Sequence, residues 1–158
     1  MEENASREES HALRGPTDRG ALCDFRDVFE KMEPLSDGTL DDIVDPSELN
    51  IHLDDGIGAA ESARLDVDWT THGDYNIHYT DADGRDLRWD LHPNDFPVAS
   101  DERHFHPPPE ATSEPNAVEE SCIERRSTEL VARATQKLWR KAYDNESFAG
   151  VNDAADPP

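Results

Sequence analysis

The chain has 158 residues, a formal net charge of -22 from 37 acidic against 15 basic residues, and only 34% hydrophobic residues. This length and apolar content predict a single domain with a small core and solvated ends. No run of 18 apolar residues is present, and the first residues lack the basic and apolar segments of a signal peptide. These absences exclude a membrane-spanning helix and predict a cytoplasmic protein.

The acidic residues are spread through segments that also have strand and helix patterns, and arginine outnumbers lysine twelve to three. A surface rich in carboxylates and poor in lysine suits concentrated salt, where the Debye length falls to about 3 Å and self-repulsion is screened. We therefore expect a halophile protein. In molar salt the negative charge excludes few partners, nucleic acid included. Cys23 and Cys122 match no metal or redox spacing, so free thiols are expected.

The N-terminal third predicts a leader, a helix, a loop and an edge strand. Residues 1–18 are polar and without periodicity, which indicates a disordered acidic leader. The following apolar residues are spaced by three and four, as in an amphipathic helix that ends before Pro34: Leu22, Phe25, Phe29 and Met32. Residues 35–46 are expected to form a loop, and the alternation of Leu49, Ile51 and Leu53 predicts an edge strand.

Three further strands follow, each with apolar residues at alternate positions. These residues are Leu65, Val67 and Trp69, then Tyr75, Ile77 and Tyr79, then Leu87, Trp89 and Leu91. The loops 71–73 and 82–84 both end in glycine, as in three-residue hairpin loops whose last residue is left-handed. The resulting register keeps every apolar residue on one face. It predicts two polar rows on the reverse face: Asp66, His78 and Arg88, then Asp68, Asn76 and Asp90.

The C-terminal part predicts a short extended segment at 103–106, ended by the prolines 107–109, and then a long helix. The helix is expected to begin near Asn116, which has Glu119 at capping-box separation. Its expected buried stripe is Ile123, Ser127, Leu130, Ala134, Leu138 and Ala142.

Together these elements predict a single α+β domain over residues 19–143, with a disordered tail at 144–158. The expected core structure is an antiparallel sheet of about four strands in a meander. One or two amphipathic helices pack on its apolar face, and both termini are disordered.

Histidine, arginine and aspartate gather around the predicted polar face. His104 and His106 project to one side of their segment, and Asp90 and His92 are paired by the same period of two. If the loop 93–103 folds back, these groups converge with the neighbouring strands. The candidate catalytic residues are His78, Arg88, Asp90, His92, His104 and His106.

Several chemistries fit these residues. Imidazole transfers protons near pH 7 and arginine stabilises a phosphoryl oxyanion, so either metal-independent phosphodiester cleavage or metal-assisted hydrolysis is possible. An H-x-H pair with a distant D-x-H is a weak metal signal, and we expect neither a metal nor a cofactor. An ordinary solvated sheet face with structural histidines is the simpler alternative. Nucleotide-binding and hydrolase motifs are absent, which disfavours nucleotide-dependent chemistry.

Six of the fifteen basic residues occur between Arg125 and Lys141, in the last predicted helix. Cations favour the carboxyl end of a helix and form i,i+4 pairs, such as Glu129 with Arg133. These effects alone explain the cluster. An RNA backbone or an acidic partner is the functional alternative.

Three motifs carry a family resemblance: W-x-x-x-G-D-Y-x-I-H-Y, R-W-D-x-H-P-N and H-F-H-P-P. Over roughly residues 63–110 the chain resembles a family of small haloarchaeal proteins and, more remotely, the TumE-type toxins of toxin–antitoxin pairs. In those toxins an aromatic-Asp step is followed by a His-x-His element, matched here by Trp89 and Asp90, then His104 and His106.

The resemblance implies a toxin that acts on RNA, with an antitoxin or helix-turn-helix regulator as its partner and no association with membranes. One histidine would take the 2′-hydroxyl proton, a second would protonate the leaving oxygen, and Arg88 would stabilise charge at phosphorus. The alternative from another class is a non-catalytic interaction protein whose histidine-rich face docks a partner.

Overall fold

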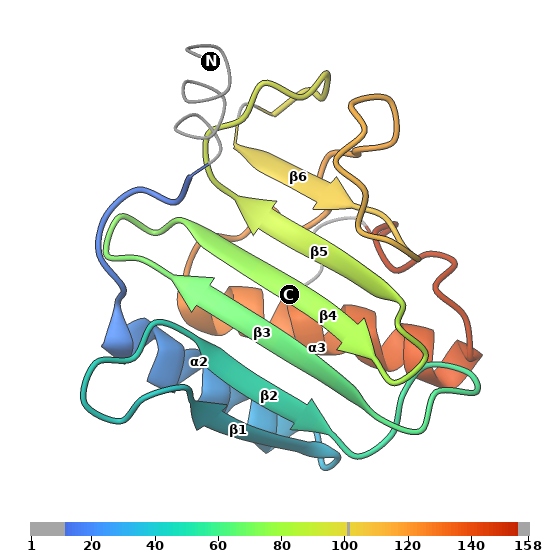
Figure 1. Cartoon of the computed structure of the whole chain (residues 1–158), viewed down its shortest axis with the longest axis horizontal. Coiled ribbons are helices and arrows are strands. Elements are labelled where there is room, and N and C mark those ends of the chain that lie inside the picture. The colour runs from blue at the N-terminus through green and yellow to red at the C-terminus, as the bar shows by residue number, and fades with distance from the viewer. Residues whose placement is uncertain (1–11, 101, 155–158) are drawn as a thin grey trace.

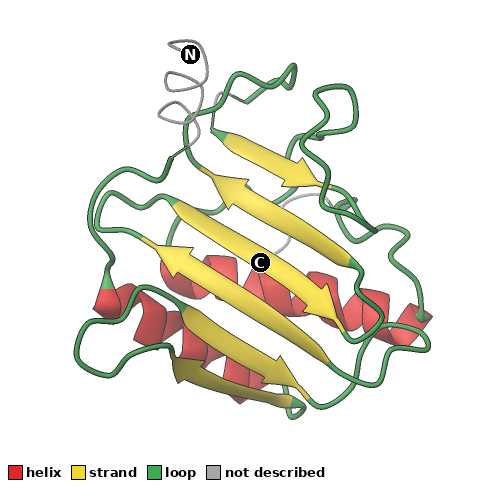
Figure 2. Ribbon diagram, in the orientation of Figure 1, coloured by secondary structure: helices red, strands yellow, loops and turns green. Residues whose placement is uncertain are grey.

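The computed structural model describes residues 12–100 and 102–154. Six antiparallel strands form one sheet in the order β1-β2-β3-β4-β5-β6, and two helices cover one of its faces. Both helices lie behind the sheet in Figures 1 and 2, so the face toward the viewer carries no helix formed by the described residues. The predicted α+β meander is confirmed, with two strands more than the sequence indicated. The disorder predicted for residues 1–11 and 155–158 lies outside the described residues.

One helix precedes the six strands along the chain, and the other follows them. In chain order the elements are α2 (Arg19–Met32), β1 (Ser36–Leu40), β2 (Leu49–Leu53), β3 (Ala63–Trp69), β4 (Tyr75–Asp81), β5 (Asp86–Leu91), β6 (Arg103–His106) and α3 (Thr128–Asn145).

The central three strands have the predicted register. Val67 lies opposite Ile77, and Ile77 lies opposite Trp89. Gly73 and Gly84 end the two hairpin loops with φ of +92° and +80°, a conformation that L-residues with a side chain rarely adopt. The alternating apolar residues are therefore all buried against the helices.

The two additional strands extend both edges of the sheet. The prediction of a loop over 35–46 is wrong for its first half, because β1 pairs with β2 and makes β2 an internal strand. The sequence SDGTL of β1 has no alternation of apolar and polar residues, so the sequence pattern did not indicate a strand there. Strand β1 is held by contact with α2. Its backbone at Gly38 lies so close to the helix that a Cβ there would be only 2.7 Å from Arg26 Cγ, and Gly38 N donates to Glu30 Oε1 (2.6 Å).

Helix α2 follows the predicted pattern. The Asp18 side chain caps it by accepting from Ala21 N (3.0 Å), as aspartate commonly does. Leu22, Phe25 and Phe29 are fully buried, and the helix ends at Met32, before Pro34.

Helix α3 begins later than predicted, so the Asn116 capping box is wrong. Its cap is Ser127, which accepts from Leu130 N (3.4 Å). Glu119 instead exchanges two backbone hydrogen bonds with Phe105 of β6 (2.7 and 3.0 Å). This non-local pairing keeps residue 119 out of the helix, because its backbone groups already have partners. Ile123 is buried in the preceding segment, before the helix begins.

Both ends of the described chain pack on the domain. Arg14 forms a hydrogen-bonded ion pair with the buried Asp74 (2.8 Å). After α3, the Phe148 ring packs edge-on against Tyr79 at a centroid distance of 5.8 Å, and Val151 is buried. Among the described residues, no helix has the length and apolar character needed to cross a membrane.

Candidate functional site

The candidate site lies on the polar face of the sheet, where β5 and β6 pair. The register places Arg88 opposite His106 and Asp90 opposite His104. Alternate residues of a strand share a face, so these four side chains project together. The two-residue spacing of the H-F-H segment thus has the predicted effect, and Phe105 between the histidines faces the core and contacts Trp89 at a ring-centroid distance of 5.7 Å.

Four nitrogen atoms surround a single oxygen of Asp90. Arg88 Nε donates to Asp90 Oδ2 at 2.7 Å. The Nε2 atoms of His104 and His106 each lie 3.2 Å from the same oxygen, and that of His92 lies at 3.6 Å. The loop after β5 therefore does bring His92 to the strand residues, as the sequence predicted. We call Asp90, His92, His104 and His106 the Asp90 cluster.

The Asp90 cluster is shielded from solvent. None of its four residues is more than 3% exposed. The Phe96 ring packs against two of the imidazoles, tilted to His104 at a centroid distance of 5.2 Å and edge-on to His106 at 5.5 Å. Burying an ionised carboxylate costs several kcal/mol unless its partners compensate, so this arrangement is far from an ordinary solvated sheet face.

Electrostatics favour an ionised Asp90 and a neutral His104. Burial opposes ionisation of Asp90, but the contacts from His104, His106 and His92, with the charge of Arg88, outweigh it and hold its pKa well below the ordinary range. Burial lowers the pKa of His104, and the neighbouring imidazoles add to that effect against the attraction of Asp90. The cluster thus holds an ionised carboxylate beside a His104 imidazole whose pKa is lowered.

The other ring nitrogen of each imidazole meets a backbone carbonyl. His92 Nδ1 lies 3.0 Å from Pro93 O, and His106 Nδ1 lies 2.9 Å from Thr112 O. His104 Nδ1 lies 3.2 Å from Glu102 O and 3.1 Å from Asn94 Nδ2. Because a carbonyl only accepts, the Nδ1 atoms of His92 and His106 carry protons.

His78 is not part of the cluster. Its Nε2 lies 3.9 Å from Asp86 Oδ1, and 35% of its side chain is exposed. It is the cross-strand partner of Arg88, whose side chain is 31% exposed. The structure therefore brings five of the six predicted residues together and leaves His78 beside them at the surface. The strand register places His78 beside Arg88, in the predicted row, and its role in the site stays a prediction.

Sequence reasoning missed three residues that contact the cluster. With its amide nitrogen turned to the carboxylate, Asn76 donates to Asp90 Oδ1 (3.0 Å). The predicted Asp68-Asn76-Asp90 row already placed Asn76 beside Asp90 and could have indicated this contact. Asn94 and Phe96 belong to the loop after β5, whose path no sequence period reveals.

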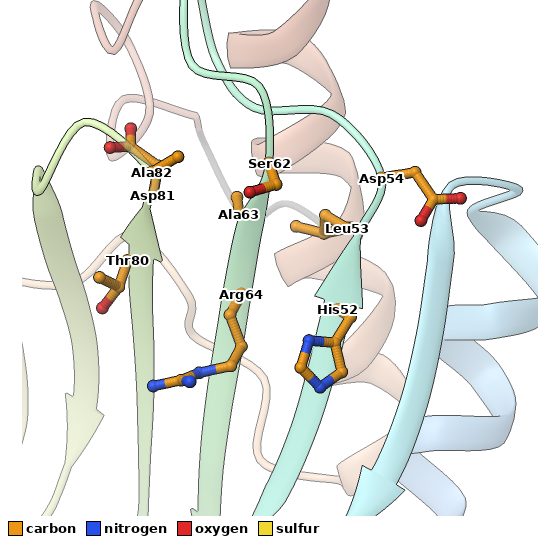
Figure 3. Close-up of a pocket in the computed structure, with 9 residues that line it drawn as sticks. All are labelled: His52, Leu53, Asp54, Ser62, Ala63, Arg64, Thr80, Asp81 and Ala82. Carbon is orange, nitrogen blue, oxygen red and sulfur yellow. The ribbon is translucent and has the colours of Figure 1, made fainter.

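A second feature of the polar face is a shallow depression of ≈ 500 Å³, which lies where β2 and β4 end and β3 begins. Figure 3 shows His52 and Arg64 projecting from neighbouring strands at its lower edge, with Ser62 and Ala82 above. None of the six predicted residues lines it. The depression is therefore separate from the Asp90 cluster.

Comparison with known families matches residues 25–145 to the family model "Toxin TumE". The chain belongs to the TumE toxin family. The match covers the second half of α2, all six strands, α3 and every predicted site residue. No curated protein and no solved structure shows a significant match to the chain.

Proposed function

We propose that this TumE-family protein is the toxin of a toxin–antitoxin pair and that it cleaves RNA on the polar face of its sheet. Arg88 and His78 would contact the substrate, and Asp90, His92, His104 and His106 would form the support beneath them. The observation that carries the proposal is the half-exposed Arg88, anchored from below by the fully buried Asp90 (Nε to Oδ2, 2.7 Å).

The guanidinium of Arg88 is held in a fixed orientation. Besides its bond to Asp90, its Nη2 lies 3.0 Å from His106 Nε2, which has no proton of its own to donate there. These two contacts leave further N–H groups for a ligand, since a guanidinium carries five donors in a planar fork. That fork matches the oxygens of a phosphate, so a pre-oriented Arg88 favours a phosphodiester as its target.

His78 supplies a group for proton transfer beside Arg88. In the proposed step, His78 Nε2 takes the proton of the 2′-hydroxyl, and the resulting oxyanion attacks the adjacent phosphorus. The bond from phosphorus to the 5′-oxygen breaks, and the leaving oxygen takes a proton from solvent. Arg88 stabilises the negative charge on the phosphoryl oxygens during this transfer. The second histidine of the sequence-based scheme is buried in the support and acts by positioning Arg88.

The biological setting follows from the same proposal. A toxin that cleaves cellular RNA acts in the cytoplasm and requires an antitoxin that restrains it. A small helix-turn-helix regulator encoded beside the toxin is the partner we propose. A neighbouring gene of that kind supports this partner, and its absence argues against it.

The test is induced expression in a halophile, with growth and total RNA followed together. The variants are His78→Gln and Arg88→Lys, which keep size or charge while removing the proton acceptor or the planar fork. His72→Gln, an exposed histidine in the β3–β4 loop, is the matched control. We expect wild type and the control to arrest growth with fragmented RNA, and each site variant to reduce fragmentation at least about tenfold, the effect of losing roughly 1.4 kcal/mol of transition-state stabilisation.

Circular dichroism of each purified variant separates loss of chemistry from loss of fold. Equal toxicity in all four proteins would contradict the assignment of Arg88 and His78. Absence of arrest by a folded wild type would contradict the toxin proposal and favour the non-catalytic interaction protein.

A further inference from the structure

We propose that the Asp90 cluster is a zinc site, in which Asp90 Oδ2 and the Nε2 atoms of His92, His104 and His106 bind one Zn²⁺ ion. This inference goes beyond the proposed function and does not depend on RNA cleavage. It rests on the convergence of these ligand atoms, on their hydrogen bonds and on their burial.

The spacing of the ligand atoms fits a tetrahedral ion. Zinc binds imidazole nitrogen and carboxylate oxygen at about 2.0–2.2 Å, which places adjacent tetrahedral ligands about 3.3–3.5 Å apart. The three Nε2 atoms lie 3.2, 3.2 and 3.6 Å from Asp90 Oδ2. The ligand atoms of Asp90, His104 and His106 all lie within 4.8 Å of one another. His92 lies outside this group, so its ring would have to move toward the other three ligand atoms to complete the tetrahedral set.

The hydrogen bonds make Nε2 the ligand atom of these rings. The Nδ1 atoms of His92 and His106 face backbone carbonyls, which leaves the Nε2 atoms to carry lone pairs. In the metal-free protein the lone pair of His106 Nε2 accepts from Arg88 Nη2 (3.0 Å). A bound Zn²⁺ would replace this donor, and Arg88 would keep its bond to Asp90 Oδ2. His104 Nε2 is buried and forms no hydrogen bond to any described residue, although it lies 3.2 Å from Asp90 Oδ2. Unprotonated nitrogens facing a carboxylate oxygen repel it, and a cation between them converts this repulsion into coordination.

The carbonyl groups complete the expected outer shell. Metal-binding histidines usually donate their second ring N–H to a carbonyl or carboxylate, which fixes the ring orientation. Pro93 O and Thr112 O have this role for His92 and His106, and Glu102 O lies within reach of His104 Nδ1.

The ligand set indicates a structural ion. Imidazole and carboxylate suit Zn²⁺, and four protein ligands leave no open position of the kind that catalytic zinc sites have. Burial of the four residues agrees with a closed site. The ion would join β5, β6 and the segment after β5, and so hold the support beneath Arg88.

Metal content of the full chain tests the proposal. Three proteins are incubated with Zn²⁺ in molar KCl: wild type, the double variant His104→Ala/His106→Ala, and His52→Ala. Each is then exchanged into zinc-free buffer at the same KCl concentration and analysed by elemental mass spectrometry. His52 is exposed on the same sheet face and is the matched control. We expect one zinc per chain in wild type and His52→Ala and about none in the double variant. Equal zinc in all three would overturn the site.

A second measurement, made on wild type, tests the site even if the double variant does not fold. Co²⁺ is titrated into folded, metal-free wild type, and its visible absorption is recorded. Intense tetrahedral bands that saturate at one equivalent and vanish on addition of Zn²⁺ support the proposal. Only weak octahedral absorption, of the kind given by ions on exposed carboxylates, would overturn it. His92→Ala should weaken Zn²⁺ binding at least about tenfold, and unchanged affinity would exclude His92 as a ligand.

Discussion

The two faces of the sheet are stabilised in different ways, and β5 shows the difference within two adjacent residues. Trp89 points to the helices and packs on Phe105, so its contribution is the burial of apolar area. Asp90 points to the other face and is equally buried, but it is surrounded by Arg88 and three imidazoles. The apolar face explains folding, whereas the polar face has a buried arrangement that folding alone does not require.

Lowering the salt should have the largest effect, because it acts on the whole chain. At a net charge of -22, self-repulsion is screened in molar KCl and grows as the Debye length increases from about 3 Å toward 10 Å and beyond. We expect the folded state to be lost as KCl falls from molar to millimolar, followed by circular dichroism. A fold that is indifferent to salt would contradict the halophile interpretation.

Replacing Trp89 or Asp90 separates the two faces. Trp89→Ala removes a large buried side chain and should lower the free energy of unfolding by about 3–5 kcal/mol. Asp90→Ala leaves Arg88 and the imidazoles without their anion and should cost a similar amount, about 3–5 kcal/mol. Denaturant titrations with and without a chelator distinguish loss of the zinc site from loss of apolar packing. The loss of unfolding free energy caused by Asp90→Ala should be smaller when zinc has been removed from both proteins, whereas the loss caused by Trp89→Ala should be unchanged.

Neutralising Asp68 should stabilise the polar face in a pH-dependent way. Burial, and then the neighbouring Glu48 carboxylate, raise the pKa of Asp68 to about 7. The folded state therefore holds a proton that the unfolded state releases near pH 4, and stability falls as pH rises from about 4 to 7. Asp68→Asn should gain about 1–2 kcal/mol at pH 8, after allowance for solvent screening, and nothing at pH 4.

Unfolding titrations at both pH values test this expectation. An equal gain at pH 4 and pH 8 would show that the effect does not come from the Asp68 proton.

The smallest expected effect comes from replacing Tyr75 on the apolar face. The Tyr75 hydroxyl is buried and has no hydrogen-bond partner among the described residues. Tyr75→Phe removes this unsatisfied group and keeps the ring stacked on Trp69, 4.7 Å away. We expect a gain of up to about 1 kcal/mol in the free energy of unfolding, measured by thermal denaturation. A loss of more than 1 kcal/mol would reveal a partner for the hydroxyl.

How much the sequence predicted depended on whether the information was local. The period of two and the glycines at 73 and 84 sufficed for the register of β3, β4 and β5, and hence for the rows that contain Arg88 and Asp90. The H-F-H spacing predicted that His104 and His106 share a face. Strand β1 and the late start of α3 could not be predicted in this way, because contact with α2 holds the first and the pairing of Glu119 with Phe105 determines the second.

The site was predictable as a set of residues but not as a chemical environment. Burial of Asp90 depends on the path of the loop after β5 and on Phe96, for which the sequence has no periodic signal. Hydrogen bonds to the carbonyls of Pro93 and Thr112 determine which ring nitrogen faces Asp90. These carbonyls belong to irregular segments, so the metal site follows from the fold and not from the H-x-H spacing.

The protonation of the ring nitrogens tests the central claim most directly. Nitrogen NMR of the histidine rings in folded, metal-free protein distinguishes Nδ1–H from Nε2–H imidazoles. We predict Nδ1–H rings for His92 and His106. We also predict a large shift of the Nε2 resonances of all three cluster histidines when one equivalent of Zn²⁺ is added. Nε2–H rings that donate to Asp90 and do not respond to Zn²⁺ would contradict the account and would leave the Asp90 cluster as a purely hydrogen-bonded support for Arg88.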